Sequence, residues 1–382
     1  MAPIKSNNPV TSFFNFFSRT GTDAVTPAPP PSDPTQQASG GTKVTHNSKV
    51  YHIFTGTGPL STPATFSKSI NYIIIGGGAG SGYNGPSGNG GNGGSGSGAV
   101  IDKSSFTLDG GLDLTVTVGA AGAKAPANGQ GSDGVASTIN FPTGTAQAHG
   151  GGAGGVVGGS SSANPPIGGG RQGGSGGGGA LYYPRAGGSA LGSPFPGTPG
   201  DSPPAGWGNV GGRGGDPGSP QNPFYYSGGG GGAGGAGETG GDGSYASGGT
   251  GGVGYLLPSD FQLPAPVMAP NPYGDPGPSG PNHWVAGGGA GGMYYDGGGG
   301  QPQTAAAARG GGASHGPGGA GYAGGGNGVV SSTGGIAFDD HIDGATNSGG
   351  GGGGGGSAAS PGGPGDGGNG GSGLVLISYP AS

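Results

Sequence analysis

The side chains best placed for metal chemistry lie near the C-terminal end, at the spacing that opens a calcium loop. Asp339, His341 and Asp343 alternate along the chain, and Gly344 follows them. In an EF-hand, positions 1, 3 and 5 supply ligands and a bidentate Glu at position 12 completes the site. Position 12 here is Gly350, which has no side chain. The pattern therefore favours a surface loop, with a weak metal site as the alternative.

Other catalytic patterns do not develop beyond single motifs. Gly80, Gly82 and Gly85 match a dinucleotide-binding fingerprint, which requires a helix directly after the glycines. Residues 86–98 read PSGNGGNGGSGSG and cannot form that helix. The six histidines are scattered, Glu238 is a lone glutamate and there is no cysteine, so no acid–base pair, triad or thiolate site emerges. The sequence predicts neither an enzyme nor a cofactor.

Aromatic islands interrupt the glycine-rich part of the chain beside its prolines. Tyr and Trp combine an apolar ring with a polar group and dominate binding hot spots. The islands either bind a receptor or cap the ends of a glycine array. The receptor-binding candidates are Tyr182, Tyr183, Trp207, Phe224, Tyr225, Tyr226, Trp284, Tyr294 and Tyr295.

Glycine dominates the composition. The chain has 112 glycines and 36 prolines among 382 residues, well past the roughly 25–30% that usually marks low complexity. Only 29% of the residues are hydrophobic, so one core cannot serve the whole chain. Only 7% are charged, whereas disordered chains usually stay soluble through charge. With so few apolar side chains, the glycine-rich part of the chain can become ordered only through backbone hydrogen bonds. The alternative is that it is disordered.

The charge distribution and the lack of long apolar runs each exclude one class of partner. All lysines lie at or before Lys124, and acidic residues outnumber arginines between residues 143 and 371. Nucleic-acid binding needs a basic stripe, so we expect no nucleic-acid partner. No apolar run approaches the eighteen residues of a membrane span, and no signal-peptide core is present, so we expect no membrane insertion.

The N-terminus combines an apolar segment with a linker. Residues 1–25 contain TSFFNFF, with Ser12 as a helix cap and Gly21 as its stop. A helix this short is unstable alone, so we expect it to dock on another chain, or alternatively on its own domain. Residues 26–47 are a Pro-rich and polar linker. The anchoring candidates are Phe13, Phe14, Phe16 and Phe17.

Short β-branched runs predict a small antiparallel β-sandwich formed by residues 48–142 and 373–382. The last strand would close the sheet, and residues 143–372 would be a glycine-rich insertion. The expected strands span residues 49–55, 70–75, 99–101, 112–118, 135–141 and 374–379.

Packed polyproline-II-like helices would order this insertion, because their N–H and C=O groups point sideways and only glycine lets backbones approach closely. All-glycine runs at residues 228–232 and 349–356 would then be interior. Segments reading GAG, GSG or GNG would be peripheral.

The chain carries an ordered series of motifs: FTGTG (54–58), NYIIIGGGAGSG (71–82), SGSGAV (95–100), LTVTVGAAG (114–122), GVASTINF (134–141), HGGGAGG (149–155) and GGSGLVLISY (370–379). This series resembles the glycine-rich domain of bacteriophage tail-fibre and adhesin proteins. The resemblance covers about residues 49–381 and does not reach the first 47.

This resemblance implies a β domain carrying polyglycine-II-type helices and used in host recognition. We expect a virion-surface protein, assembled in the host without a signal peptide and anchored to other virion proteins through its N-terminus. Its expected partner is a host surface glycan or outer-surface protein, and its expected copy arrangement is a homotrimer. The alternatives are a non-adhesive virion structural protein and a disordered interaction scaffold.

Overall fold

The computed structural model is mainly β, with almost no helix in the residues it describes. Its two short helical turns are η2 (Ser259–Phe261) and α2 (Ala265–Met268). Residues 1–35, with the predicted N-terminal helix and its four phenylalanines, lie outside the described part. The described residues are 36–83, 91–126, 129–157, 168–181, 185–194, 201–215, 224–241, 248–269, 271–277, 280–295, 323–328, 330–332, 335–337, 342–358 and 366–382.

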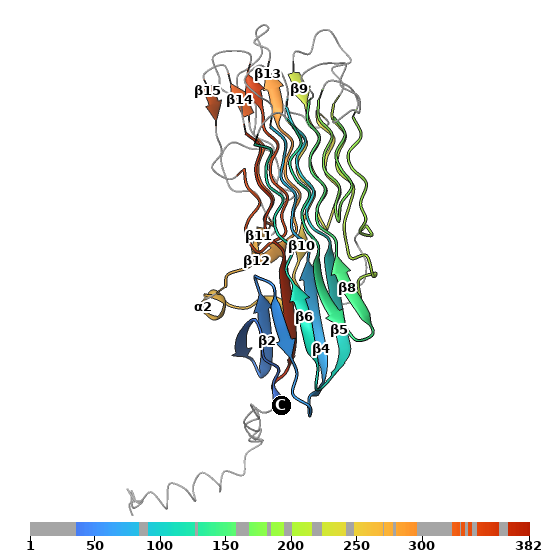
Figure 1. The fold of residues 1–382 in the computed structure, drawn as a ribbon. Coiled ribbons are helices and arrows are strands. Elements are labelled where there is room, and N and C mark those ends of the chain that lie inside the picture. The colour runs from blue at the N-terminus through green and yellow to red at the C-terminus, as the bar shows by residue number, and fades with distance from the viewer. Residues whose placement is uncertain are drawn as a thin grey trace, which may run out of the picture.

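Two antiparallel sheets form one end of the molecule (Figure 1). The five-stranded sheet has the order β1-β2-β17-β4-β5, and the four-stranded sheet has the order β3-β6-β7-β8. The C-terminal strand β17 is therefore central, between β2 and β4, and not at the edge of its sheet. The strands are β1 (Thr42–His46), β2 (Lys49–Phe54), β3 (Gly58–Ser61), β4 (Ser67–Ile75), β5 (Val100–Asp109), β6 (Asp113–Thr117), β7 (Ser137–Phe141), β8 (Gly144–Ala148) and β17 (Leu374–Pro380).

The two sheets pack face to face around an apolar core. Ile70, Tyr72 and Ile74 point into it from β4, as alternation along a strand requires. Leu114 and Ile139 face them from the other sheet.

A second apolar core covers the opposite face of the five-stranded sheet. Ile73 and Ile75 lie there, so β4 is buried on both faces and its sequence is a continuous apolar run. The covering segment includes β10 (Tyr255–Leu256), η2, α2, β11 (Asp275–Gly277) and β12 (Gly280–Val285). Its buried side chains are Tyr255, Leu257, Phe261, Leu263, Met268, Tyr273 and Val285.

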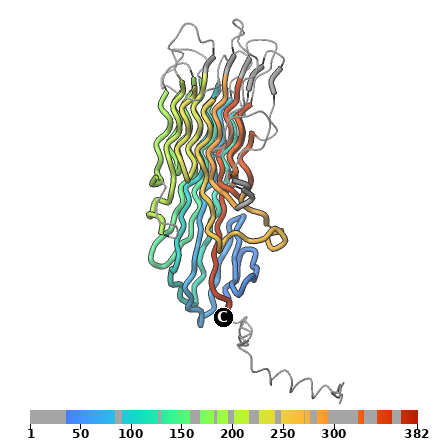
Figure 2. Tube along the Cα trace, turned by 180° about the vertical axis from the view of Figure 1, so that it is seen from behind, coloured from blue at the N-terminus to red at the C-terminus, as the bar shows by residue number. Residues whose placement is uncertain are grey.

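Glycine segments extend the strands at the other end of the sandwich. The chain leaves β4 at Gly76 and returns through residues 91–99 into β5, and it reaches β17 through residues 366–373. Figures 1 and 2 show these segments running side by side from the sandwich to the far end of an elongated molecule. The array thus grows from the sheets themselves, and it includes segments before residue 143 as well as the predicted insertion.

Hydrogen bonds within the array repeat every third residue. In the segment 91–99, successive N–H groups donate to three different neighbours in turn. The first neighbour accepts at Gly355, Gly352 and Gly349, from Asn92, Ser95 and Gly98 respectively. The second accepts at Gly155, Gly152 and His149, from Gly93, Gly96 and Ala99. The third accepts at Gly228 and Gly231, from Gly94 and Ser97. Carbonyl groups of the same segment accept from three further segments, through the N–H groups of Ala79, Gly178 and Gly289. An extended helix with three residues per turn produces this pattern.

Residues 228–232 and 349–356 are buried, as the sequence predicts. The prediction that alanine, serine and asparagine mark peripheral segments is wrong. Ala79, Asn92, Ser95 and Ala153 are fully buried.

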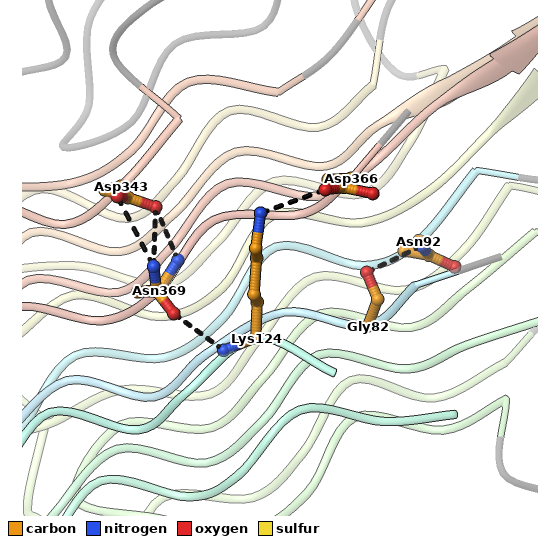
Figure 3. Close-up of polar contacts among 6 residues, drawn as sticks. All are labelled: Gly82, Asn92, Lys124, Asp343, Asp366 and Asn369. Atoms are coloured by element: carbon orange, nitrogen blue, oxygen red, sulfur yellow. Dashed lines mark hydrogen bonds and ion pairs between the residues drawn. The ribbon is translucent and has the colours of Figure 1, made fainter. Parts of the chain in front are cut away.

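For Ser81 and Asn92 the reason lies in acceptor capacity, because a carbonyl oxygen has two lone pairs. Ser81 Oγ donates to the Gly93 oxygen at 3.0 Å, and Asn92 Nδ2 donates to the Gly82 oxygen at 2.9 Å (Figure 3). A small side chain can therefore replace glycine inside the array where it hydrogen-bonds a neighbouring backbone.

Outer segments need inward-facing residues at only every third position. Along residues 119–126, Gly119, Gly122 and Ala125 are buried while Ala121 and Ala123 are exposed. Two of every three residues in this segment therefore face away from the array.

Three strands of the sandwich were absent from the sequence prediction: β1, β3 and β8. β1 falls in residues 26–47, which the sequence analysis assigns to a linker. It forms a hairpin with β2, and the turn residues Asn47 and Ser48 have φ of 47° and 59°. Such left-handed turns match the twist of paired strands.

Candidate functional site

A small sheet of aromatic strands lies at the far end of the array, opposite the C-terminus (Figure 1). Its order is β16-β13-β9, with β9 (Phe224–Tyr226), β13 (Met293–Tyr295) and β16 (Ser357–Ala358). Beside it, β14 (Val330–Ser332) and β15 (Gly335–Ala337) form a hairpin. We name these five strands the tip.

Backbone pairing at the tip joins two aromatic islands that are far apart in the sequence. Tyr294 is the antiparallel partner of Tyr225, and Tyr295 is the partner of Phe224. The pairing continues into the array, where the Ser227 N–H donates to the Gly292 carbonyl at 3.2 Å. Aromatic residues favour strands, so each island changes a glycine segment into a strand where the array ends.

Met293 and Tyr226, the tip residues whose side chains the structure describes, are buried, with 1% and 8% of their surface exposed. They are also partners across β13 and β9. These two residues therefore close the end of the array, which fits the capping interpretation, while the two partner pairs beyond them lie further from it along the strands.

Tyr182 and Tyr183 lie outside the described residues, but the positions flanking them reach the same end. The Arg185 carbonyl accepts from the Gly214 N–H, and the adjacent Gly215 N–H donates to the Tyr226 carbonyl. The chain therefore leaves and re-enters the array level with β9.

The two tryptophans lie elsewhere. Trp207 forms a bridge with Val100 at the start of β5 and is 6% exposed. Trp284 lies in β12, opposite Leu256 of β10, and is half-buried. The sequence-predicted receptor-binding residues thus divide between the tip and the sandwich side, and they do not form one surface.

Of the metal candidates, Asp339 and His341 lie outside the described residues. Asp343 is exposed, and its Oδ1 accepts from the Asn369 N–H at 2.7 Å. Asn369 Oδ1 accepts in turn from the Lys124 N–H, and Lys124 Nζ pairs with Asp366 at 3.0 Å (Figure 3). These contacts tie three outer segments together. Among the described residues, no group of three or more His, Cys, Asp and Glu side chains could hold a metal ion.

Buried titratable groups lie in the sandwich. His52 Nδ1 contacts the Gly40 carbonyl at 2.7 Å, and its Nε2 contacts the Tyr379 hydroxyl at 3.0 Å. Burial lowers the pKa of His52 from 6.5 to about 4 and raises the pKa of Tyr379 to about 12. Neutral His52 therefore donates through Nδ1 to the carbonyl and accepts the Tyr379 proton at Nε2.

Asp102 and Tyr255 form a second buried contact. The Tyr255 hydroxyl donates to Asp102 Oδ2 at 2.5 Å, and Asp102 is 2% exposed. Burial, together with the neighbouring carboxylate, raises the pKa of Tyr255 well above its ordinary value. This hydrogen bond fastens the covering segment to β5, and neither buried contact adjoins the tip.

Sequence reasoning missed the hairpin of β14 and β15 and the pairing of β16. A local signal existed for the hairpin, since residues 329–333 read VVSST between Gly328 and Gly334. No local signal marks Ser357 and Ala358. They pair with β13 because the glycine segment before them, residues 349–356, ends beside that strand.

No protein-family model matches this chain, and no curated protein is significantly similar to it. Within its described residues, the chain has no helix of the length and apolar character needed to cross a membrane.

Proposed function

We propose that this chain is a bacteriophage virion protein of the tail-fibre or adhesin type. In this proposal residues 1–25 join the virion, the sandwich forms the base, the glycine array is a polyglycine-II-type shaft, and the tip contacts a host surface glycan or outer-surface protein.

The proposal rests on which parts of the chain lie at the two ends of the molecule. The C-terminus lies at one end, and the described chain begins beside it, because the Ala38 N–H donates to the Tyr379 hydroxyl at 2.9 Å. The strands of the tip gather at the opposite end (Figures 1 and 2). A chain anchored by its N-terminus would therefore hold the tip furthest from its attachment point.

The chemistry of the array supports the same division of roles. Its N–H and C=O groups are engaged between neighbouring segments, which makes it rigid but leaves few side chains for recognition. Recognition must then fall to the connections that carry side chains. Tyr225 and Tyr294 are the leading candidates, because their strands pair.

A non-adhesive structural protein of the virion is the second candidate function, since Tyr226 and Met293 are buried where the array ends. Labelling the tip on intact particles and imaging them separates the two. Labels pointing outward from a tail fibre support the adhesin, and labels inaccessible between neighbouring virion proteins support the structural role.

A further inference from the structure

Three of the four sheet edges in the sandwich are protected, and the fourth is bare. Exposed strand edges pair with other chains unless charge, proline or a covering segment prevents it. β1 carries Lys43, β3 carries Pro59 and is bridged by Ser39, and residues 201–207 bridge β5. β8 reads GTAQA, with no charge and no proline, and no described residue pairs with its outer edge.

The backbone of β8 is therefore open to a further strand. Phe141 and Gly144 flank the two-residue turn between β7 and β8. The alternation of an antiparallel ladder then directs the N–H and C=O groups of Thr145 and Gln147 away from β7. Both residues are exposed.

A groove of 790 Å³ runs beside this edge, between β8 and β5. Its size is within the roughly 300–1,000 Å³ of ligand pockets. Tyr72, Phe106 and Phe141 line it, with ring centroids 4.6 to 5.7 Å apart. Lys103 and Asp201 form an ion pair at the groove. The groove thus offers an apolar, aromatic floor next to an unpaired strand.

These features fit an extended peptide that adds a strand to β8 and inserts large apolar side chains into the groove. A second copy of β8 does not fit this description, because its core-facing side chains, Ala146 and Ala148, are too small to fill the groove. Residues 13–17 of this chain read FFNFF, uncharged and aromatic.

The length of the connecting chain permits this docking. The Ser39 bridge to Ser61 places the start of the described chain at β3, the opposite edge of the same sheet. Crossing from β3 to β8 takes about 15 Å at the ordinary strand spacing. Residues 18–35 can span on the order of 60 Å.

We propose that, in the free protein, residues 13–17 dock as an extended strand on the outer edge of β8 and place phenylalanine side chains in the groove. The docked strand replaces the short helix that the spacing of the phenylalanines in TSFFNFF favours, because that helix is unstable alone. Docking keeps four phenylalanines out of water, and it does not depend on the adhesin proposal.

Hydrogen exchange of the full-length protein tests this directly. A variant with Phe13, Phe14, Phe16 and Phe17 all changed to Ser should exchange the amides of Thr145 and Gln147 at least about 10-fold faster than the unchanged chain. A synthetic peptide of residues 11–18 should restore their protection. Changing Pro29, Pro30 and Pro31 to Ser is the matched control and should leave the exchange unchanged.

A second variant tests the acceptor. Thr145→Lys places a charge on the exposed edge of β8, where it should abolish peptide binding without unfolding the sandwich. Equal exchange of the β8 amides in the unchanged chain and the phenylalanine variant would overturn the proposal, whether both are protected or both are open. Protection that weakens on dilution would support docking on a neighbouring copy, and constant protection would support docking within one chain.

Discussion

Tyr225 of β9 and Tyr294 of β13 are antiparallel partners at the far end of the glycine array. Each belongs to an aromatic island that interrupts a different glycine segment. Their pairing makes one structural unit from two islands that the sequence presents separately, and this unit has the largest aromatic content at the tip.

Changing Tyr225 and Tyr294 together to Ala should reduce particle adsorption to host cells, because aromatic truncation at a binding hot spot typically costs about 2 kcal/mol or more per residue. The measurement is adsorption of particles carrying the variant, alongside its melting temperature. Trp284→Ala, on the sandwich side, is the matched control and should leave adsorption intact.

The same experiment separates binding from capping. A variant that melts at the normal temperature but fails to adsorb supports the adhesin. A variant that adsorbs normally excludes these residues from receptor binding. A collapse of stability before any change in adsorption would make the two tyrosines part of the cap with Tyr226 and Met293.

The sandwich was largely predictable from the sequence because apolar alternation survives wherever a strand faces a core. β4 was visible as a continuous run, and β17 repeated its composition. β8 was not, since GTAQA is neither apolar nor β-branched as a whole and is a strand only through its pairing with β7. The central position of β17 depends on pairing between distant segments, which no local pattern specifies.

The sequence predicted which all-glycine runs are buried, but not how small polar residues are accommodated among them. Pure glycine runs correctly indicated buried segments, whereas the burial of Ser81 and Asn92 depends on which carbonyl groups neighbouring segments leave available. The role of Tyr255 was also hidden. An aromatic beside glycine and proline reads as a surface island, and only the fold shows it hydrogen-bonded to buried Asp102.

Gly351→Val should destabilise the array strongly. A Cβ at this position would lie 2.0 Å from the Ser95 carbonyl oxygen, which is backbone and cannot move aside. We expect a loss of at least about 1–3 kcal/mol and a melting temperature lowered by several degrees. Gly56→Val is the control, because an added Cβ there meets nothing within 4 Å. Equal melting temperatures for the two variants would show that residue 351 is not packed in the array.

Deleting residues 1–25 should leave a folded protein that no longer joins the virion. The two apolar cores and the array are formed by residues from Ala38 onward, so the deletion removes none of their contacts. Circular dichroism and thermal unfolding check the fold, and the protein content of purified particles checks incorporation. Replacing residues 26–31 by a Gly-Ser linker is the control. Normal incorporation of the truncated chain would refute the anchoring role.

Tyr255→Phe should cost about 1.5–3 kcal/mol, the range for hydrogen bonds to charged groups, because Asp102 loses a donor in a buried site. Tyr51→Phe, in the same core, is the matched change. No hydrogen bond joins its hydroxyl to any described residue, so we expect a smaller loss. The free energy of unfolding of both variants in denaturant gives the comparison, and equal losses would argue against a contribution from this hydrogen bond.

The stability of the sandwich should decrease as the pH falls from about 6.5 to 4, owing to His52. Burial lowers the pKa of His52 to about 4 in the folded chain, with nearby Lys43 adding to the effect. The unfolded chain takes up a proton at its ordinary pKa of 6.5, so acid favours unfolding across this window. Above 6.5 the residue is neutral in both states and its contribution to stability is fully present.

The difference corresponds to about 3 kcal/mol by pH 4. Denaturant unfolding of the unchanged protein and of His52→Gln between pH 4 and 8 measures it. The His52→Gln curve should be flatter by that amount. Parallel curves for the unchanged and His52→Gln proteins would mean that His52 becomes protonated in the folded state, with Tyr379 and Gly40 adjusting to the charged ring.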